Sequence, residues 1–365
     1  MAEQSKKGYL ILGDISGYTS FLAKVELEHA HEILTDLLEV IVENFKPLLT
    51  ISKLEGDAVF AYVDETKIVR GEILLELIET TYVAFRQRRD TSNRATTCSC
   101  RACQSMPSLE LKFFVHCGSY MIQRVAGIKE LVGSDVNLVH RLMKNHITEH
   151  TGWNAYTLFS KYAMECLNLT IEDTHNQVET YEHLGDIDTV TINLIPRYDA
   201  LVSERLHYLT EEDADVTVSQ KYEINDVELW QILTSTEILT QMMADTKWTI
   251  ANLTGGRTEI GATNHCLHGK GMMRFTIVDW HPFTYFTGHG VDGKHKFYQM
   301  YELEPLPDNA GTILYWRWKN DTGLPHWLGK LMGATIGKMI GRGFCKMVDD
   351  YLAKIQQPIF HPEVE

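Results

Sequence analysis

The hydrophobic pattern of the first half of the chain predicts a mixed α+β domain. Short apolar runs without helical spacing, such as residues 9–12, are typical of buried strands. Longer segments carry apolar side chains at helical spacing, and Pro47 ends the first of them. We expect helices at 22–49, 68–88 and 151–166, and a hairpin formed by the strands 109–115 and 118–125. This order predicts a sheet with helices on one face.

The second half predicts an antiparallel sheet bounded by helices. Residues 216–224 alternate as a strand, and Asn225 and Asp226 can cap a following helix. Further strands are expected near 246–252, 258–268, 271–279, 283–290, 295–304 and 311–319, with a last helix over about 325–356. The acidic segment 197–215 lacks periodicity. We therefore expect a first domain at 1–196, a linker at 197–215 and a second domain at 216–365.

Charge and composition narrow the classes of partner. The formal net charge of −15 disfavours a nucleic-acid partner, which needs a basic face. No run of 18 uncharged apolar residues exists, so no transmembrane segment is expected. The first seven residues lack the apolar core of a signal peptide, and we expect a cytoplasmic protein.

Two carboxylates stand where strands meet turns. Asp14 follows the apolar run 9–12, between Gly13 and Gly17, and Asp57 opens a second apolar run. Carboxylates beside exposed backbone carbonyls suit a hard cation such as magnesium. If the two strands are neighbours, Asp14 and Asp57 could hold one or two cations. The alternative is an ordinary strand and turn in which the carboxylate has no function.

A third stretch, residues 130–142, begins as a turn and becomes helical. Asn137 and Arg141 stand four residues apart and share one face of that helix. An amide and a guanidinium on one face suit a ribose and a phosphate better than they suit a core.

Together these stretches resemble the catalytic domain of class III nucleotide cyclases, the adenylyl and guanylyl cyclase family. Leu12-Gly-Asp-Ile-Ser-Gly-Tyr-Thr19 stands in place of the family's F-x-D-I-x-G-F-T pattern. Lys53 to Asp57 matches K-x-x-G-D, and Gly133 to Leu142 matches G-x-x-V-N-x-A-x-R-L, with Val139 in place of alanine. The resemblance covers residues 8–195 and implies a ferredoxin-like α+β fold.

The resemblance also implies an activity: conversion of a nucleoside triphosphate to a 3′,5′-cyclic nucleotide and diphosphate. It implies two magnesium or manganese ions per site and a homodimer that shares each site between subunits. The roles it implies are metal binding by Asp14, Asp57 and the Ile15 carbonyl, base contact by Lys53 and Glu130, ribose orientation by Asn137, and phosphate stabilisation by Arg141. Lys53 favours ATP, whereas Glu130 replaces the usual base-selecting Asp or Thr.

One departure from the family concerns a lysine that contacts the triphosphate. The segment 181–190 resembles the family's late strand, but Val190 stands near the place where that lysine is expected. The rival hypothesis is therefore a catalytically silent module that binds only nucleotide or a partner.

A cysteine cluster interrupts the cyclase-like pattern at residues 90–108. Cys98, Cys100 and Cys103 form C-x-C-x-x-C, which can supply three ligands of a structural zinc site. His116 or Cys117 could be the fourth ligand. A reduced surface loop, redox chemistry and an iron–sulfur centre are the alternatives.

The second domain resembles the START-like helix-grip superfamily. The resemblance rests on the stretch 222–230 and the pattern from Gly261 to Phe286, and it implies an apolar small molecule or lipid bound between the sheet and the last helix. A third hypothesis makes this domain a small-molecule enzyme or carrier. The last helix carries Gly329, Gly333, Gly337 and Gly341 at spacings of four. This stripe indicates close packing or room for a ligand, or else a membrane dimerisation helix.

Overall fold

The computed structural model divides the chain into two compact units, Met1–Ser203 and Glu204–Glu365, which we call the first and second units. The described residues are 5–22, 27–95, 105–202, 207–243, 246–268, 271–293, 295–307, 310–321, 330 and 337–355. Among them, no helix is both long enough and apolar enough to cross a membrane. The boundary between the units falls inside the acidic segment 197–215.

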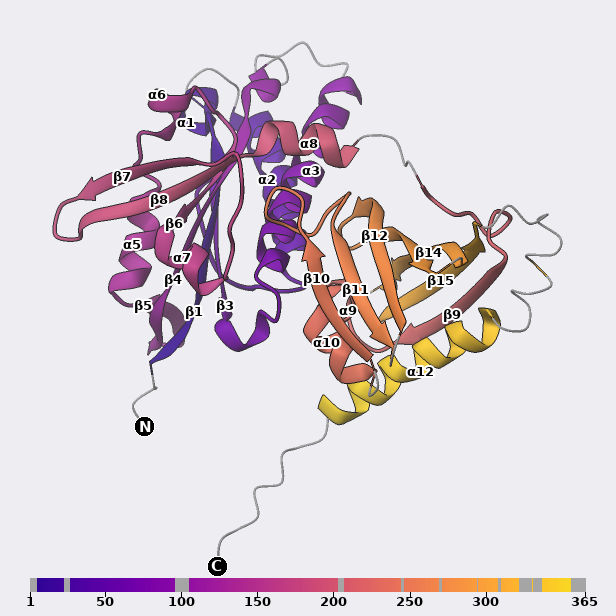
Figure 1. Ribbon diagram of the computed structural model, residues 1–365. Coiled ribbons are helices and arrows are strands. Elements are labelled where there is room, and N and C mark those ends of the chain that lie inside the picture. Colours follow the sequence, from indigo (N-terminus) through magenta and orange to yellow (C-terminus); the bar gives the residue numbers. More distant parts are fainter. Residues whose placement is uncertain are drawn as a thin grey trace, which may run out of the picture. The chain divides into compact units, whose positions relative to one another are not determined.

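The first unit is built on an eight-stranded sheet in which β1 lies between β3 and β4 (Figure 1). Its strands are β1 (Lys6–Ser16), β2 (Thr50–Glu55), β3 (Ala58–Asp64), β4 (Glu110–Val125), β5 (Ile128–Val132), β6 (Tyr156–Ser160), β7 (His175–Tyr181) and β8 (Gly185–Asn193). The order is β2-β3-β1-β4-β6-β8-β7, and β5 pairs with the far half of β4. Both neighbours of β1 run antiparallel to it, and β4 and β6 are parallel.

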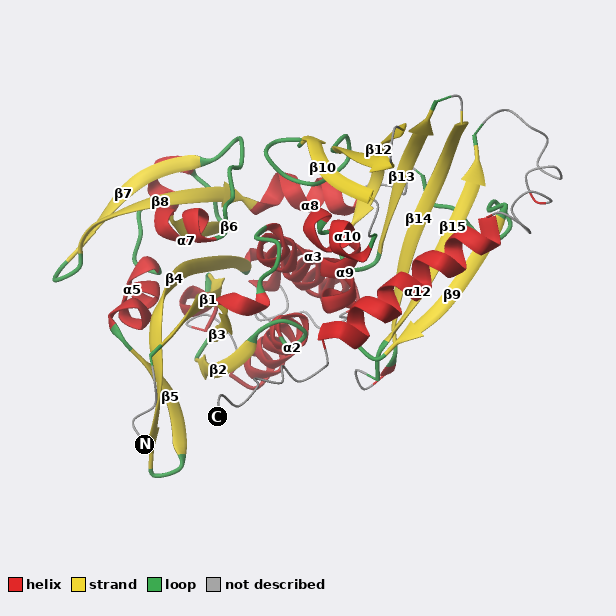
Figure 2. Ribbon diagram, turned by 60° about the horizontal axis from the view of Figure 1, so that its bottom comes forward, coloured by secondary structure: helices red, strands yellow, loops and turns green. Residues whose placement is uncertain are grey.

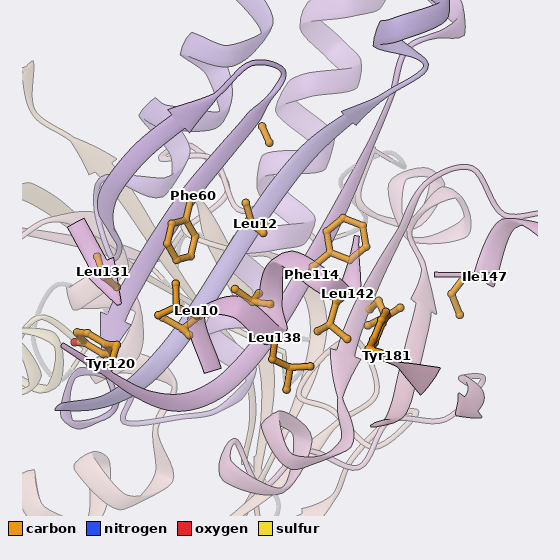
Figure 3. Close-up of a cluster of buried hydrophobic side chains, with 14 of the residues drawn as sticks. Leu10, Leu12, Phe60, Phe114, Tyr120, Leu131, Leu138, Leu142, Ile147 and Tyr181 are labelled. Atoms are coloured by element: carbon orange, nitrogen blue, oxygen red, sulfur yellow. The ribbon is translucent and has the colours of Figure 1, made fainter. Parts of the chain in front are cut away.

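Helices cover both faces of this sheet, whereas the sequence predicted them on one face. The helices are α1 (Tyr18–Leu22), α2 (Leu27–Phe45), α3 (Glu72–Ala95), α5 (Ser134–Leu142), α6 (Ile147–Thr151), α7 (Lys161–Cys166) and α8 (Leu194–Val202). A side chain at Gly13 of β1 would meet Ile41 of α2. Leu10 and Leu12 point to the opposite face, where they pack in one cluster with residues of α5 (Figure 3). The alternation of β1 therefore supplies apolar side chains to two layers.

The cluster beneath α5 is the part of the core that positions the site. The α5 residues that belong to this cluster are buried, whereas Asn137 and Arg141 of the same helix face solvent. The 3.6-residue period therefore divides α5 into a core face and an exposed face. The buried members from α5 are Val136, Leu138, Val139 and Leu142, and those from the sheet include Leu10, Leu12, Phe60, Phe114 and Leu158.

The hairpin predicted from 109–125 is wrong. Residues 110–125 form one 16-residue strand, and the turn comes later, at Ala126 and Gly127, which have φ of 50° and 85°. Positive φ at two successive residues is the geometry of a tight hairpin turn. Gly118 lies inside β4 instead, where a Cβ would come within 2.4 Å of Asp135.

The helix predicted over 151–166 is also wrong in its first half. Residues 156–160 form β6, in which every residue is buried, and only 161–166 are helical. A short apolar run fits a buried strand or a helix equally well, and Ser160 decides the boundary because its side chain caps α7 through the backbone N–H of Ala163.

The second unit is an antiparallel seven-stranded sheet with the order β10-β11-β12-β13-β14-β15-β9. Its strands are β9 (Val216–Tyr222), β10 (Thr246–Asn252), β11 (Thr263–His268), β12 (Gly271–His281), β13 (Tyr285–Asp292), β14 (His295–Pro305) and β15 (Thr312–Asn320). The helix predicted after Asn225 is divided at Ser235 into α9 (Asp226–Thr234) and α10 (Thr236–Met242), and the Ser235 side chain caps the second helix.

The last helix, α12 (Lys338–Ile355), lies along β9 and β15 (Figure 2). A Cβ at Gly341 would approach the Trp316 ring to 2.6 Å, and one at Gly337 would approach Val216 to 2.9 Å. The prediction of close packing by the glycine stripe is confirmed at these two positions. Gly329 and Gly333 lie outside the described residues.

Candidate functional site

The structure brings Asp14 and Asp57 together at one end of β1. Asp14 stands opposite Ala58 of β3, and Asp57 precedes Ala58 in the turn between β2 and β3. The backbone N–H of Ile15 donates to the carbonyl of Asp57 over 3.1 Å. That hydrogen bond holds the turn against the strand end, so two carboxylates from segments 43 residues apart become neighbours.

The electrostatics of this pair favour a bound cation. Burial, and then the negative charge of Asp57, raise the pKa of Asp14 to about 6, while Lys112 opposes the shift. Burial also raises the pKa of Asp57. Two partly buried carboxylates that disfavour ionisation gain from a hard cation, and their oxygens are ligands that magnesium accepts. The described residues contain no group of three or more His, Cys, Asp or Glu side chains suited to a metal, so a cation here would have few protein ligands.

Lys112 is a third charged member of this site, and the sequence analysis missed it. It stands opposite Asp14 on β4, and its Nζ donates to Thr148 Oγ1 over 3.2 Å and lies 5.0 Å from the centre of the Tyr156 ring. Burial lowers its pKa, and the charge of Asp14 opposes that effect. No described carboxylate lies within ion-pair distance of Lys112, so its ammonium keeps donors available for an anion. Lys112 can be assigned to the site only from the register between β1 and β4, which the hydrophobic pattern of the sequence does not determine.

Lys53 and Glu130 meet in a pocket of about 420 Å³. Lys53 Nζ lies 3.1 Å from Glu130 Oε1 and 3.0 Å from Glu55 Oε1. Hydrogen bonding to Glu55 raises the pKa of Lys53 despite partial burial. The remaining wall comes from β5 and the first turns of α5: Leu131, Val132, Gly133, Val136, Asn137 and His140. Residues distant in the sequence therefore converge on one cavity.

The exposed face of α5 borders this pocket. Asn137 lines the pocket and, like Arg141 one turn later, is exposed. Arg141 forms no ion pair with any carboxylate in the described part of the chain, so its guanidinium can receive an anion. Gly133 precedes the helix with φ of 153°, and a Cβ there would come within 3.0 Å of the Ser119 carbonyl. Glycine thus allows the tight entry into α5.

The site residues therefore form two sets within one chain. Asp14, Asp57 and Lys112 form one, and Lys53, Glu130 and Asn137 form the other, whose pocket lining includes neither aspartate. Val190 lies half-buried in β8 and supplies no charge. The predicted zinc ligands Cys98, Cys100 and Cys103 lie outside the described residues. Cys117 is a buried free cysteine, and His116 Nδ1 is hydrogen-bonded to Ser160 Oγ at 2.8 Å.

The second unit has a small cavity where the sequence predicts a ligand site. It is lined mainly by aromatic and aliphatic side chains, including Trp248, Phe275, Trp280 and Phe344. Its volume of about 30 Å³ is near that of one water molecule, far below the several hundred Å³ that a drug-sized ligand fills. The predicted apolar ligand therefore remains a prediction.

Comparison with known protein families and sequences finds partial matches. Residues 34–151 match the model of a family described as a protein of unknown function, DUF2652. The uncharacterized protein Rv2561/Rv2562 of Mycobacterium tuberculosis (strain ATCC 25618 / H37Rv) is 27% identical over 164 residues, which cover 44% of this chain and 73% of that protein.

Among solved structures, nucleotide cyclases are similar to about half of this chain. A bacterial light-regulated adenylyl cyclase matches with a TM-score of 0.42 and 13% identity over 53% of this chain, but only 54% of that one. The guanylyl cyclase Cya2 matches with a TM-score of 0.40 and 14% identity, covering 52% of this chain and 93% of its own. The adenylyl cyclase CyaB from P. aeruginosa matches with a TM-score of 0.41 and 16% identity, covering 53% of this chain and 96% of its own.

Proposed function

We propose that the first unit is a nucleotide cyclase-like domain that binds a nucleoside triphosphate and forms a 3′,5′-cyclic nucleotide and diphosphate. The observation that carries the proposal is the convergence of residues 53, 130 and 137 on one pocket of about 420 Å³. These positions belong to motifs that are far apart in the sequence. Their meeting in space in one pocket is what a nucleotide site needs.

The chemistry of each site residue suits a different part of a nucleoside triphosphate. Lys53 and Glu130 present a donor and an acceptor to a base, and the Asn137 amide suits the ribose. Arg141 supplies a guanidinium for phosphate oxygens, which it can bind with two parallel hydrogen bonds. Asp14 and Asp57, with the Ile15 carbonyl, would hold magnesium or manganese, which neutralises phosphate charge when bound. Lys112 adds a fixed positive charge beside that pair.

The proposed active form is a homodimer in which one subunit supplies the carboxylates and the other the α5 face. Within one chain, Asp14 and Asp57 do not line the pocket that contains Asn137. A two-fold axis would bring the two sets together twice, giving two equivalent sites.

A second candidate is a catalytically silent nucleotide-binding module. The observation that favours it is Val190, an apolar residue near the place where the cyclase family carries a triphosphate lysine. Lys112 argues for the enzyme, since it provides a partly buried ammonium opposite Asp14 on β4.

One experiment separates the two candidates. Purified full-length protein is incubated with ATP, GTP, CTP or UTP in magnesium or manganese, and cyclic products are detected by mass. We expect a 3′,5′-cyclic product that Asp57→Ala abolishes while the melting temperature is kept. Binding of a triphosphate without any product supports the silent module. Absence of both binding and product contradicts both candidates.

A further inference from the structure

The nucleotide pocket contains a chain of alternating charges that extends beyond Lys53 and Glu130. Glu55 Oε1 lies 3.0 Å from Lys53 Nζ and also 3.0 Å from His140 Nε2. The order along the wall is therefore Glu130, Lys53, Glu55, His140. All four side chains line the same pocket and are 26–55% exposed, so a ligand can reach them.

The hydrogen bonds of His140 fix the position of its ring. Its Nδ1 lies 2.7 Å from the backbone carbonyl oxygen of Val136, and its Nε2 lies 3.0 Å from the Glu55 carboxylate. His140 therefore connects the backbone of α5 to Glu55. The edge of the ring against Phe60 fixes its orientation further.

Glu55 Oε1 contacts both Lys53 Nζ and His140 Nε2, which leaves Glu55 Oε2 for a ligand. Glu55 Oε2 has no hydrogen-bond partner among the described residues, and neither has Glu130 Oε2. Lys53 uses two of its three N–H donors on these carboxylates. The wall thus offers a ligand one N–H donor, from Lys53, and two acceptors, Glu55 Oε2 and Glu130 Oε2.

We infer that Glu55 is a second base-reading carboxylate, that His140 is the positioning residue that holds it, and that the pocket selects bases carrying an exocyclic amino group over uracil. This inference rests on the proposed function. Adenine and cytosine present an amino group beside a ring acceptor, and guanine presents a carbonyl beside two N–H donors. Uracil presents a carbonyl on each side of its one N–H, so a carbonyl would face a carboxylate and leave it without a donor.

His140 is needed for this selection because its Nε2 holds the Glu55 carboxylate. Without His140, Glu55 would keep only Lys53 as a partner on this wall, and it could turn away from the pocket to reach water. In His140→Gln the neutral amide would keep a donor toward Glu55, whereas His140→Ala would keep none.

The test uses the full-length protein and four probes, the 3′-deoxy forms of ATP, GTP, CTP and UTP, which lack the attacking hydroxyl and cannot be cyclised. Dissociation constants are measured by calorimetry with magnesium present. We expect wild type to bind the ATP analogue at least roughly tenfold more tightly than the UTP analogue, since an unmade hydrogen bond to a charged group has about that effect. Glu55→Gln and His140→Ala should reduce this ratio to between one and about three, chiefly by weakening the ATP analogue.

Two controls separate positioning from simple loss of structure. His140→Gln should recover part of the ratio that His140→Ala loses, and His31→Gln, at an exposed histidine of α2, should leave the ratio unchanged. Melting temperatures are recorded for every variant.

The outcomes are distinguishable. If wild type binds but does not discriminate, or if both variants keep its ratio, the inference is wrong and the proposed function stands. A His140→Ala protein that melts earlier with an unchanged ratio shows a structural role only and overturns the positioning role. Failure of wild type to bind any of the four analogues or the parent triphosphates contradicts the proposed function and this inference together.

Discussion

The environment of Asp14, a candidate site residue, lowers the stability of the folded state. Its carboxylate is partly buried beside Asp57, and its pKa of about 6 means that folding favours the protonated form. Ionised Asp14 therefore destabilises the folded state above about pH 6. The destabilisation shrinks between pH 6 and pH 4 and disappears below about pH 3, where the carboxyl group is largely protonated in both folded and unfolded chains.

Asp14→Asn should therefore raise the melting temperature of the metal-free protein at pH 7.5. The gain has an upper limit of about 3 kcal/mol, because one pKa unit corresponds to about 1.36 kcal/mol. The difference from wild type should shrink as the pH is lowered from 7 toward 4. Thermal melts across this range check it. A variant that is less stable than wild type at pH 7.5, or whose advantage grows on acidification, contradicts the assigned environment.

Lys112→Met should weaken binding of a nucleoside triphosphate by roughly tenfold or more, because a partly buried ammonium beside the carboxylate pair is lost. Methionine keeps most of the length of the side chain but removes the ammonium that lies over the Tyr156 ring. Lys46→Met, at an exposed residue after α2, is the matched control. Affinities are measured by calorimetry. Equal affinity of the Lys112 variant and wild type for the triphosphate would show that Lys112 does not contribute to binding.

At the level of single residues, the sequence predicts candidate site residues that lie in recognisable motifs. It misses those that reach the site only through the pairing of distant strands. Asp14, Asp57 and Asn137 stand out because glycines and apolar runs surround them. Lys112 occupies the polar position of an alternating strand, which normally points to solvent. It becomes partly buried only because β4 pairs with β1 beneath α6. Long-range register is set by packing that no local pattern records.

At the level of elements, the periodic segments were predictable and the short apolar ones were not. The α2 and α3 helices and most strands of the second unit lie near their expected positions. The segment 156–160 was predicted as helix because its apolar residues suit either structure, and pairing with β4 and β8 makes it a strand. In β4, the sequence predicts a hairpin turn between 115 and 118, where the strand is continuous and contains Gly118. The lack of a side chain at Gly118 serves instead to let Asp135 approach, and the Asp135 side chain accepts from the Ser119 N–H over 2.7 Å.

The two glycines of α12 give a test at this scale. Gly341→Val should destabilise the second unit by about 1–3 kcal/mol, because the new side chain would overlap the Trp316 ring. Gly343→Ala is the matched control, since a Cβ at Gly343 meets no atom within 4 Å. That change should stabilise the helix by up to about 1 kcal/mol. Denaturant titration of both variants measures the difference. Equal free energies of unfolding would mean that α12 does not pack on β15 as described.

At the level of the whole molecule, the chain joins a mixed α+β unit to an antiparallel sheet with a packed terminal helix. Each unit has its own buried core, and the second contains a cavity of about 30 Å³. The sequence predicted two domains from the change in pattern near 197–215. It could not predict the size of the cavity, which depends on how Trp280, Phe286 and their neighbours interlock.

The subunit arrangement is the property that the proposed activity depends on most. Asp57→Ala and Arg141→Ala chains should each be inactive alone, because each homodimer lacks one half of both sites. In a mixed dimer one site carries both substitutions, and the other site is intact. If subunits exchange at random and the two sites act independently, activity of an equal mixture should return to roughly a quarter of wild type, as a closed two-fold assembly allows. Native mass spectrometry must first establish that mixed dimers form. Mixed dimers without activity, alongside an active wild type, would show that each chain builds its own site and that the α5 face of one subunit does not serve the carboxylates of another.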